Sequence, residues 1–205
     1  ESVRTIRSLP NVLRLCDKAD VVSFDVFDTL LYRTIEPPDF LKRIAATYSA
    51  ELYSARGYPV TADLFLYLRN ESESHQRRMS QKQGADTECK LSEIIYEVLY
   101  RLFGADVAKV ETATLVQKEL NIELDHLREA QGVTELLKQL KLSGKRIIAT
   151  TDTYLEQSHL HEIFAHLGLD PWVDAIYASS EHRLGKYSGR LFQKILQTEE
   201  IRPGQ

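Results

Sequence analysis

Three side chains able to take part in polar chemistry stand where apolar stretches of the sequence end. Asp25 follows the apolar residues 21–24, Thr151 closes the stretch 146–151, and Lys186 lies shortly before a helical pattern. A carboxylate can attack an electrophilic centre, while a hydroxyl and an ammonium group can hold the displaced oxygens of an anion. Gathered around one crevice, these groups predict a covalent aspartyl mechanism acting on an anionic substrate.

Alternating strands and helices would bring these side chains together. We predict strands at residues 21–24, 146–151 and 173–178, and helices at 133–142, 155–167 and 189–197, the last capped by Ser188. This order predicts an α/β fold with a doubly wound parallel sheet, in which ligands bind beyond the carboxyl ends of the strands. Asp25, Thr151 and the loop after Ala178 fall at such ends. Residues 151–153 are expected to open the next helix, so that its first N–H groups face the same point.

The segment that follows the first strand is helical in character throughout. Thr61 suits an N-cap, and apolar positions recur at helical spacing over residues 91–103 before Gly104 ends the pattern. We therefore predict an insertion of four helices. The expected boundaries are 34–128 for the helical insertion, and 1–33 with 129–205 for the α/β core.

Bulk composition narrows the classes of partner. The chain has 205 residues, a net charge of −4 and 43% hydrophobic residues, which suits a globular core with an insertion. This charge argues against nucleic acid, and the polar residues 69–75 and 77–78 are expected to form a solvent-exposed helix face. No apolar run reaches the ~18 residues of a membrane span.

Cys16 and Cys89 are far apart and are expected to be reduced thiols in a cytoplasmic protein. Because the sequence begins at Glu1, we take it as part of a larger chain.

The order of these motifs resembles the haloacid dehalogenase-like superfamily. Its first motif is an apolar strand followed by Asp-x-Asp-x-Thr, which Phe24 to Leu30 match at Asp25 and Thr29. Residues 147–152 are similar to the second motif, and residues 184–192 to the third, cationic motif. The resemblance implies a Rossmann-like core, a helical C1-type cap that closes over the site, Mg²⁺ as cofactor and hydrolysis of a small phosphorylated molecule.

The resemblance also implies roles for individual residues. Asp25 would be the nucleophile and a magnesium ligand, and Thr151, Asp152 and Lys186 would bind the phosphate. Thr29 and Asp28 belong to the expected catalytic set. Arg33, just past the first motif, could reach a substrate anion or could join core and cap by hydrogen bonds, and both alternatives stay open.

Two departures from the family pattern affect the expected chemistry. The second aspartate of the first motif, the usual acid/base of the phosphatases, falls on Phe27, and Asp28 comes one residue late. Phe27 can still offer its backbone carbonyl to magnesium. Loss of a positioned general acid costs roughly 10²–10⁴-fold, so such an enzyme should be slow, prefer good leaving groups, or recruit Asp28 or a cap residue.

The second departure concerns the fourth motif, which supplies aspartates for magnesium. Glu199 and Glu200 approach its place but are expected to be helix-end surface residues, so magnesium should bind weakly to this chain. Three functions follow: a magnesium-dependent phosphatase, a dehalogenase that carries Phe27 in place of the acid, or a non-catalytic binding module. In the family the fourth strand lies beside the first, so residues 21–24 are expected to present an open edge, with self-association as one consequence.

Overall fold

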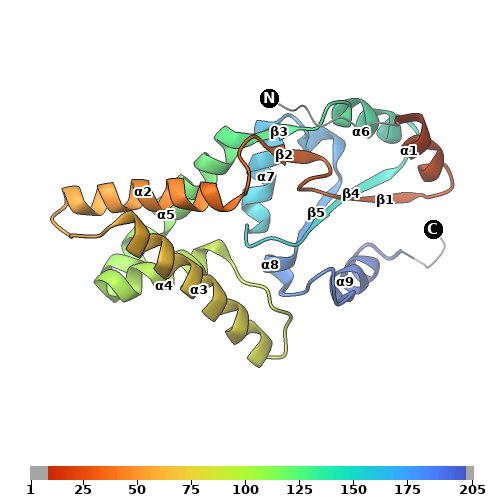
Figure 1. Ribbon diagram of the computed structural model, residues 1–205. Helices are drawn as coiled ribbons and strands as arrows, with labels where there is room; N and C mark the ends of the chain where they lie inside the picture. The colour runs from red at the N-terminus through yellow and green to blue at the C-terminus, as the bar shows by residue number, and fades with distance from the viewer. Residues whose placement is uncertain (1–8, 202–205) are drawn as a thin grey trace. The chain divides into compact units, whose positions relative to one another are not determined.

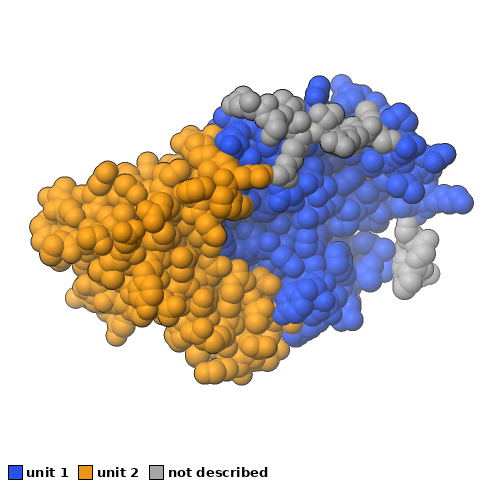
Figure 2. All heavy atoms as spheres, in the orientation of Figure 1, with its two compact units in different colours: residues 1–34, 127–205 blue, residues 35–126 orange. Residues whose placement is uncertain are grey.

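The computed structural model describes residues 9–201, which form two compact units (Figures 1 and 2). Of the described residues, 9–34 and 127–201 make the first, called here the α/β unit, and 35–126 make the second, called the four-helix unit. The sequence boundaries drawn above at 33/34 and 128/129 lie within two residues of these. None of the helices within the described residues is both long and apolar enough to span a membrane.

A parallel sheet forms the centre of the α/β unit, as predicted. Its order is β1 (Val21–Asp25), β4 (Arg146–Thr151) and β5 (Ala175–Ala178), and both pairs are parallel. The described part of this unit also contains five α-helices and a 3₁₀ turn, which complete the alternation of strand and helix. Their bounds are α1 Leu9–Cys16, α6 Val133–Leu142, α7 Gln157–His166, η1 Asp170–Trp172, α8 Ser179–His182 and α9 Arg190–Thr198.

Helices pack on the sheet because its strands are apolar on both faces. Ile148 and Tyr177 pack with Leu191 and Ile195 of α9. The residues that alternate with them along β4 and β5 point to the other face, and α6 packs against β4 while α7 packs against β5 (Figure 1). The fold is therefore doubly wound.

Strand β1 is one of the two edge strands of this sheet in the described residues. Within residues 9–201 it pairs only with β4, and its residues Ser23 and Asp25 are exposed. Val21 and Ser23 line a groove of about 190 Å³ together with side chains of α9 and with Ile201. Self-association through this edge stays a prediction.

Two elements near the site depart from the sequence prediction. Residues 151–153 do not open a helix, because α7 begins only at Gln157 with Glu156 as its N-cap. The last helix is capped by Gly189, which has a φ of +76°, rather than by Ser188. The Ser188 hydroxyl still accepts a hydrogen bond from the Arg190 N–H at 3.3 Å.

A second, antiparallel pair of strands was missed by sequence reasoning. It joins β2 (Leu31–Arg33) to β3 (Leu127–Glu129), with Arg33 opposite Leu127. These strands directly flank residues 35–126 in the sequence. The chain therefore leaves the α/β unit and returns to it through two strands that pair with each other.

The four-helix unit consists of helices whose ends were largely readable in the sequence. They are α2 Asp39–Ala55, α3 Ala62–Lys82, α4 Leu91–Phe103 and α5 Ala105–His126. The Thr61 hydroxyl accepts from the Leu64 N–H at 3.2 Å, which confirms the predicted N-cap. Gly104 follows α4 with a φ of +86°, a conformation that glycine adopts without strain.

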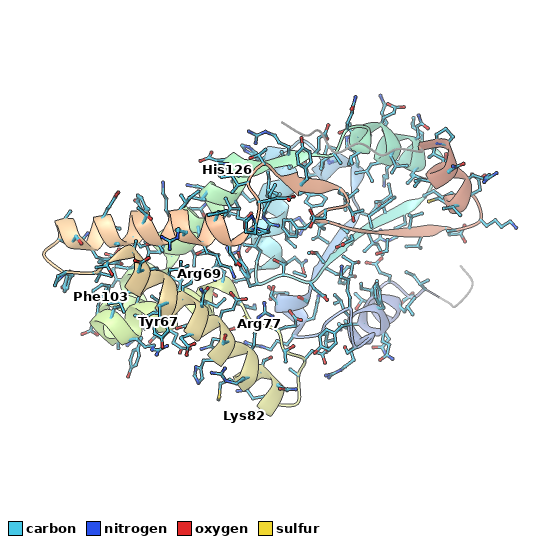
Figure 3. All side chains as sticks on the ribbon, viewed as in Figure 1. Tyr67, Arg69, Arg77, Lys82, Phe103 and His126 are labelled. Atoms are coloured by element: carbon cyan, nitrogen blue, oxygen red, sulfur yellow. The ribbon has the colours of Figure 1, made fainter. Side chains whose placement is uncertain are left out.

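The predicted solvent-exposed face at residues 69–75 holds for Asn70, Glu71, Ser74 and His75, but it is wrong for Arg69, Ser72 and Glu73. Arg69 on α3, labelled in Figure 3, is 1% exposed. Its guanidinium binds Glu119 of α5 at 2.5 and 3.3 Å. Arg69 also binds Glu73 at 2.9 Å, while Lys42 binds Glu73 at 3.1 Å. Arg77 is half-buried and binds the same carboxylate at 3.0 Å. Arg69 and Glu73 thus belong to a largely buried ion network rather than to a solvated surface.

Candidate active site

Asp25 and Lys186 are in direct contact. Asp25 is the last residue of β1, and Lys186 lies in the loop between α8 and α9. The Lys186 ammonium group donates a hydrogen bond to Oδ1 of Asp25 at 2.8 Å, and the Val26 N–H donates to the same oxygen at 2.9 Å. The Asp25 side chain is 44% exposed. The carboxylate is thus oriented through Oδ1, and Oδ2 is the oxygen left to face a ligand.

Hydrogen bonds between two loops hold Lys186 in this position. Both carboxylate oxygens of Asp152 accept from the backbone N–H of Lys186, at 2.9 and 3.1 Å. The Ser179 hydroxyl accepts from the Thr153 N–H at 2.9 Å, and the Ser180 hydroxyl donates to the Leu155 carbonyl at 2.6 Å. The loop after β4 is therefore fastened to the segment after β5. Asp152, expected among the phosphate-binding residues, holds the backbone of Lys186 in this structure.

Thr151 lies at the same end of the sheet. It is the last residue of β4, and because Asp25 pairs with Thr150, Thr151 extends one residue farther than Asp25. Its side chain is buried, with 1% exposed. No hydrogen bond within residues 9–201 joins Thr151 to Asp25. The structure thus links Asp25 to Lys186 directly and brings Thr151 to the same strand end.

A tight turn follows the nucleophile candidate. The Val26 carbonyl accepts from the N–H groups of Leu30 and Leu31, and the Asp28 N–H donates to the Leu31 carbonyl at 2.7 Å. Asp28 has a φ of +60°, a left-handed conformation that aspartate tolerates better than most residues. The side chains of Asp28 and Thr29 are exposed on this turn. The turn leads directly into β2.

Phe27 and Arg33 form a contact that sequence reasoning missed. The Arg33 guanidinium carbon lies 4.3 Å from the centroid of the Phe27 ring. A cation at this distance is attracted by the negative face of the aromatic ring. Periodicity could not reveal the pair, because the intervening residues form an irregular turn. The ring of Phe27, two positions after Asp25, therefore holds a second cation, the guanidinium group of Arg33.

The magnesium site implied by the family resemblance is incomplete in the described residues. Mg²⁺ requires near-octahedral oxygen ligation. Asp25 and the Phe27 carbonyl are the expected donors, but Oδ1 of Asp25 is bonded to Lys186 and both oxygens of Asp152 to a backbone N–H. No group of three His, Cys, Asp or Glu side chains in residues 9–201 is arranged to hold a metal. This donor set does not fit a full magnesium site.

Glu199 does not add to that donor set. Its carboxylate binds Arg146 at 2.5 Å and accepts from the Tyr177 hydroxyl at 2.6 Å. Arg146 is the first residue of β4, whereas Thr151 is the last, so Glu199 lies at the opposite end of the strand. The hydrogen bond from Arg146 holds the pKa of Glu199 below its usual range. Glu199 therefore joins α9 to the sheet, and its side chain is 7% exposed rather than at the surface.

Comparison with protein families gives one match across most of the chain. Residues 19–205 match the model of haloacid dehalogenase-like hydrolases. No curated protein matches the sequence.

Solved structures with the same arrangement are distant in sequence. A 2-haloacid dehalogenase from Pseudomonas syringae pv. Tomato DC3000 has a TM-score of 0.56 at 16% identity, with 89% of this chain and 73% of that chain covered. A candidate beta-phosphoglucomutase from Thermotoga maritima has a TM-score of 0.50 at 20% identity, with 90% and 72% covered. L-2-haloacid dehalogenase from Xanthobacter autotrophicus, with chloropropionic acid covalently bound, has a TM-score of 0.50 at 14% identity, with 90% and 66% covered. At these identities the likeness concerns the fold.

Proposed function

The chain belongs to the haloacid dehalogenase-like hydrolase family, and from that premise we propose that it hydrolyses a small phosphorylated molecule through an aspartyl phosphate on Asp25. The observation that carries this proposal is the Asp25–Lys186 pair, with 2.8 Å between the ammonium nitrogen and Oδ1. The ammonium group orients the carboxylate, and it can also hold an oxygen of a phosphoryl group placed above it. Anionic substrates are therefore favoured over neutral ones.

The proposed reaction has two displacement steps at phosphorus. In the first, Oδ2 of Asp25 attacks phosphorus, the bond to the ester oxygen breaks, and the electron pair leaves with that oxygen. Lys186 and the Thr151 hydroxyl hold the charged equatorial oxygens while this happens. In the second, water attacks the same phosphorus, the Asp25 carboxylate is released, and the water proton passes to solvent. Asp152 acts on both steps by keeping Lys186 in place.

Magnesium is part of this proposal only as a weakly held ion. Asp25 and the carbonyl of Phe27 would be its contacts, and its usual contribution is to neutralise phosphoryl charge. Because the described donor set is incomplete, the two steps above are assigned to side chains alone.

A panel of small phosphate esters tests the proposal. Phosphate release should depend on Asp25, so the Asp25→Asn variant should lose it, whereas Asp106→Asn on the exposed start of α5 should retain it. Trapping the intermediate adds a direct readout, since the phosphorylated protein should gain one phosphoryl mass on Asp25. Phosphate release that is equal in wild type and Asp25→Asn would refute the assignment.

A second candidate is hydrolysis of a carbon–halogen bond, and the Phe27–Arg33 pair is the observation that favours it. In that reaction Asp25 attacks carbon, halide leaves as the anion, and water cleaves the resulting ester. An arginine beside an aromatic ring suits a departing halide or a substrate carboxylate. Halide release from 2-haloacids without added metal, abolished in Asp25→Asn, would select this function over the first.

A further inference from the structure

We propose that Arg33 is the residue that determines which leaving group the site accepts, and that the substrates are phosphates whose leaving group departs as a stable anion. Acyl phosphates and enol or aryl phosphates have this chemistry, whereas simple alkyl esters do not. The inference rests on the proposed function of Asp25. It adds a class of substrate and a specificity-determining residue to that function.

Two contacts fix the position of the Arg33 guanidinium group. Arg33 is the last residue of β2 and pairs with Leu127 of β3, so its backbone is fixed by a ladder. Its side chain lies over the ring of Phe27, with 4.3 Å from the guanidinium carbon to the ring centroid. Phe27 follows Asp25 by two residues at the start of the hydrogen-bonded turn. The guanidinium is thus held on the ring of Phe27, the residue two positions after Asp25.

The cations beside the Asp25 segment offer a leaving group charge in place of a proton. A useful general acid has a pKa near the working pH, but a guanidinium keeps its proton in proteins, and a lysine ammonium normally does so at neutral pH. Lys186 and Arg33, both cationic side chains, are joined to the Asp25 segment. What they supply well is positive charge, which stabilises negative charge as it develops on a departing oxygen.

The bond changes at phosphorus decide which leaving groups can depart. When Oδ2 of Asp25 bonds to phosphorus, the leaving oxygen takes the electron pair and departs unprotonated beside Arg33. A weakly basic oxygen can depart as an anion without a proton, whereas an alkoxide departs in this way far more slowly. Water then releases the Asp25 carboxylate, and its proton goes to solvent. The rate must therefore fall steeply as the leaving group becomes more basic.

Asp28 is the rival in this reasoning, since its exposed carboxyl group follows Phe27 directly. If Asp28 protonated the leaving oxygen, rates would depend only weakly on leaving-group basicity, and Asp28→Asn would make that dependence steep. If Arg33 acts by charge, Asp28→Asn leaves the slope unchanged and Arg33→Met steepens it. The two residues thus predict opposite responses of one measured slope.

The experiment is a series of substituted phenyl phosphates, with acetyl phosphate as the acyl member, assayed for kcat/KM. We expect kcat/KM of the wild type to fall roughly three- to tenfold for each unit of leaving-group pKa. Arg33→Met should lower it by a further roughly 10²-fold on the poorest leaving groups and less on the best. Arg33→Lys should recover part of this loss. The control variant Arg78→Met, at an exposed position of α3, should match wild type. Circular dichroism of each variant establishes that it is folded.

Every outcome decides the matter. A steep wild-type slope that Arg33→Met steepens further supports the inference. A shallow wild-type slope, an unchanged slope in Arg33→Met, or a steepening in Asp28→Asn overturns it while leaving the phosphatase function intact. Absence of any Asp25-dependent phosphate release overturns the proposed function itself and the inference with it.

Discussion

Replacing Arg69 by methionine should destabilise the four-helix unit strongly. The Arg69 side chain is 1% exposed and that of Glu119 is 5% exposed, so the variant leaves a buried carboxylate without its guanidinium partner. Glu73 keeps Lys42 and Arg77, and the loss therefore falls mainly on Glu119. Breaking a buried ion pair by removing one partner costs about 3–5 kcal/mol. We expect Arg69→Met to lower the free energy of unfolding by that amount.

A double variant isolates the cause of this loss. In Arg69→Met with Glu119→Leu both charges are gone, and apolar side chains of similar volume occupy the site. Such replacements are often neutral, so the double variant should return to within about 1 kcal/mol of wild type. The exposed pair Arg43–Asp63, with side chains 56% and 81% exposed, provides the matched control. Arg43→Met should cost about 1 kcal/mol or less.

Urea unfolding followed by far-ultraviolet circular dichroism measures these differences. The reasoning fails if Arg69→Met costs no more than Arg43→Met. It fails equally if the double variant is no more stable than Arg69→Met, because the cost would then come from lost packing and not from an unpaired charge.

Three further predictions concern positioning, pH and metal. Asp152→Ala should lower kcat by roughly 10²-fold by releasing Lys186, whereas Asp152→Asn, which keeps an acceptor oxygen, should retain most activity; equal losses in both would contradict the positioning role. Burial raises the pKa of Glu73, but Lys42, Arg69 and Arg77 outweigh burial and hold it at about 2, below the ordinary 4.5. Its contribution to stability, up to about 3 kcal/mol, is therefore complete above pH 4.5 and lost as the pH falls toward 2. The free energies of unfolding of Glu73→Gln and wild type, measured in urea, should therefore converge as the pH falls through that window. A difference that stays constant with pH would count against this prediction. Isothermal titration with Mg²⁺ should show weak binding. Tight stoichiometric binding would disprove the conclusion that the set of magnesium donors is incomplete.

The sheet and its neighbouring helices could be predicted because their residues are strongly patterned. The bounds of α6 and β4 agree with the predicted residues 133–142 and 146–151, since an apolar helix stripe, Gly144 and an apolar run follow one another there. The start of α7 was wrong for a physical reason. Asp152 and Thr153 are engaged by Lys186 and Ser179 of the neighbouring segment, and the helix begins only after them.

Partners far apart in the sequence account for the rest. Strands β2 and β3 have three residues each, too few to show alternation, and each is recognisable only beside the other. Arg69 was predicted to be exposed because a charged helix residue usually is, and its partner Glu119 lies 50 positions later. At the site, the order of Asp25, Thr151 and Lys186 was readable. The fastening of Lys186 by Asp152 and the stacking of Arg33 on Phe27 required three dimensions.

The pairing of β2 with β3 makes the helical insertion separable at the level of the backbone. Arg33 stands opposite Leu127 in the ladder, so the two ends of the excised segment would already be neighbours. A two-residue Asn-Gly turn spans such a gap in an ordinary hairpin. Replacing residues 34–126 by such a turn would leave a protein of fewer than about 120 residues that keeps Asp25, Lys186 and Arg33. Its activity would report the reactivity of the site without the four-helix unit.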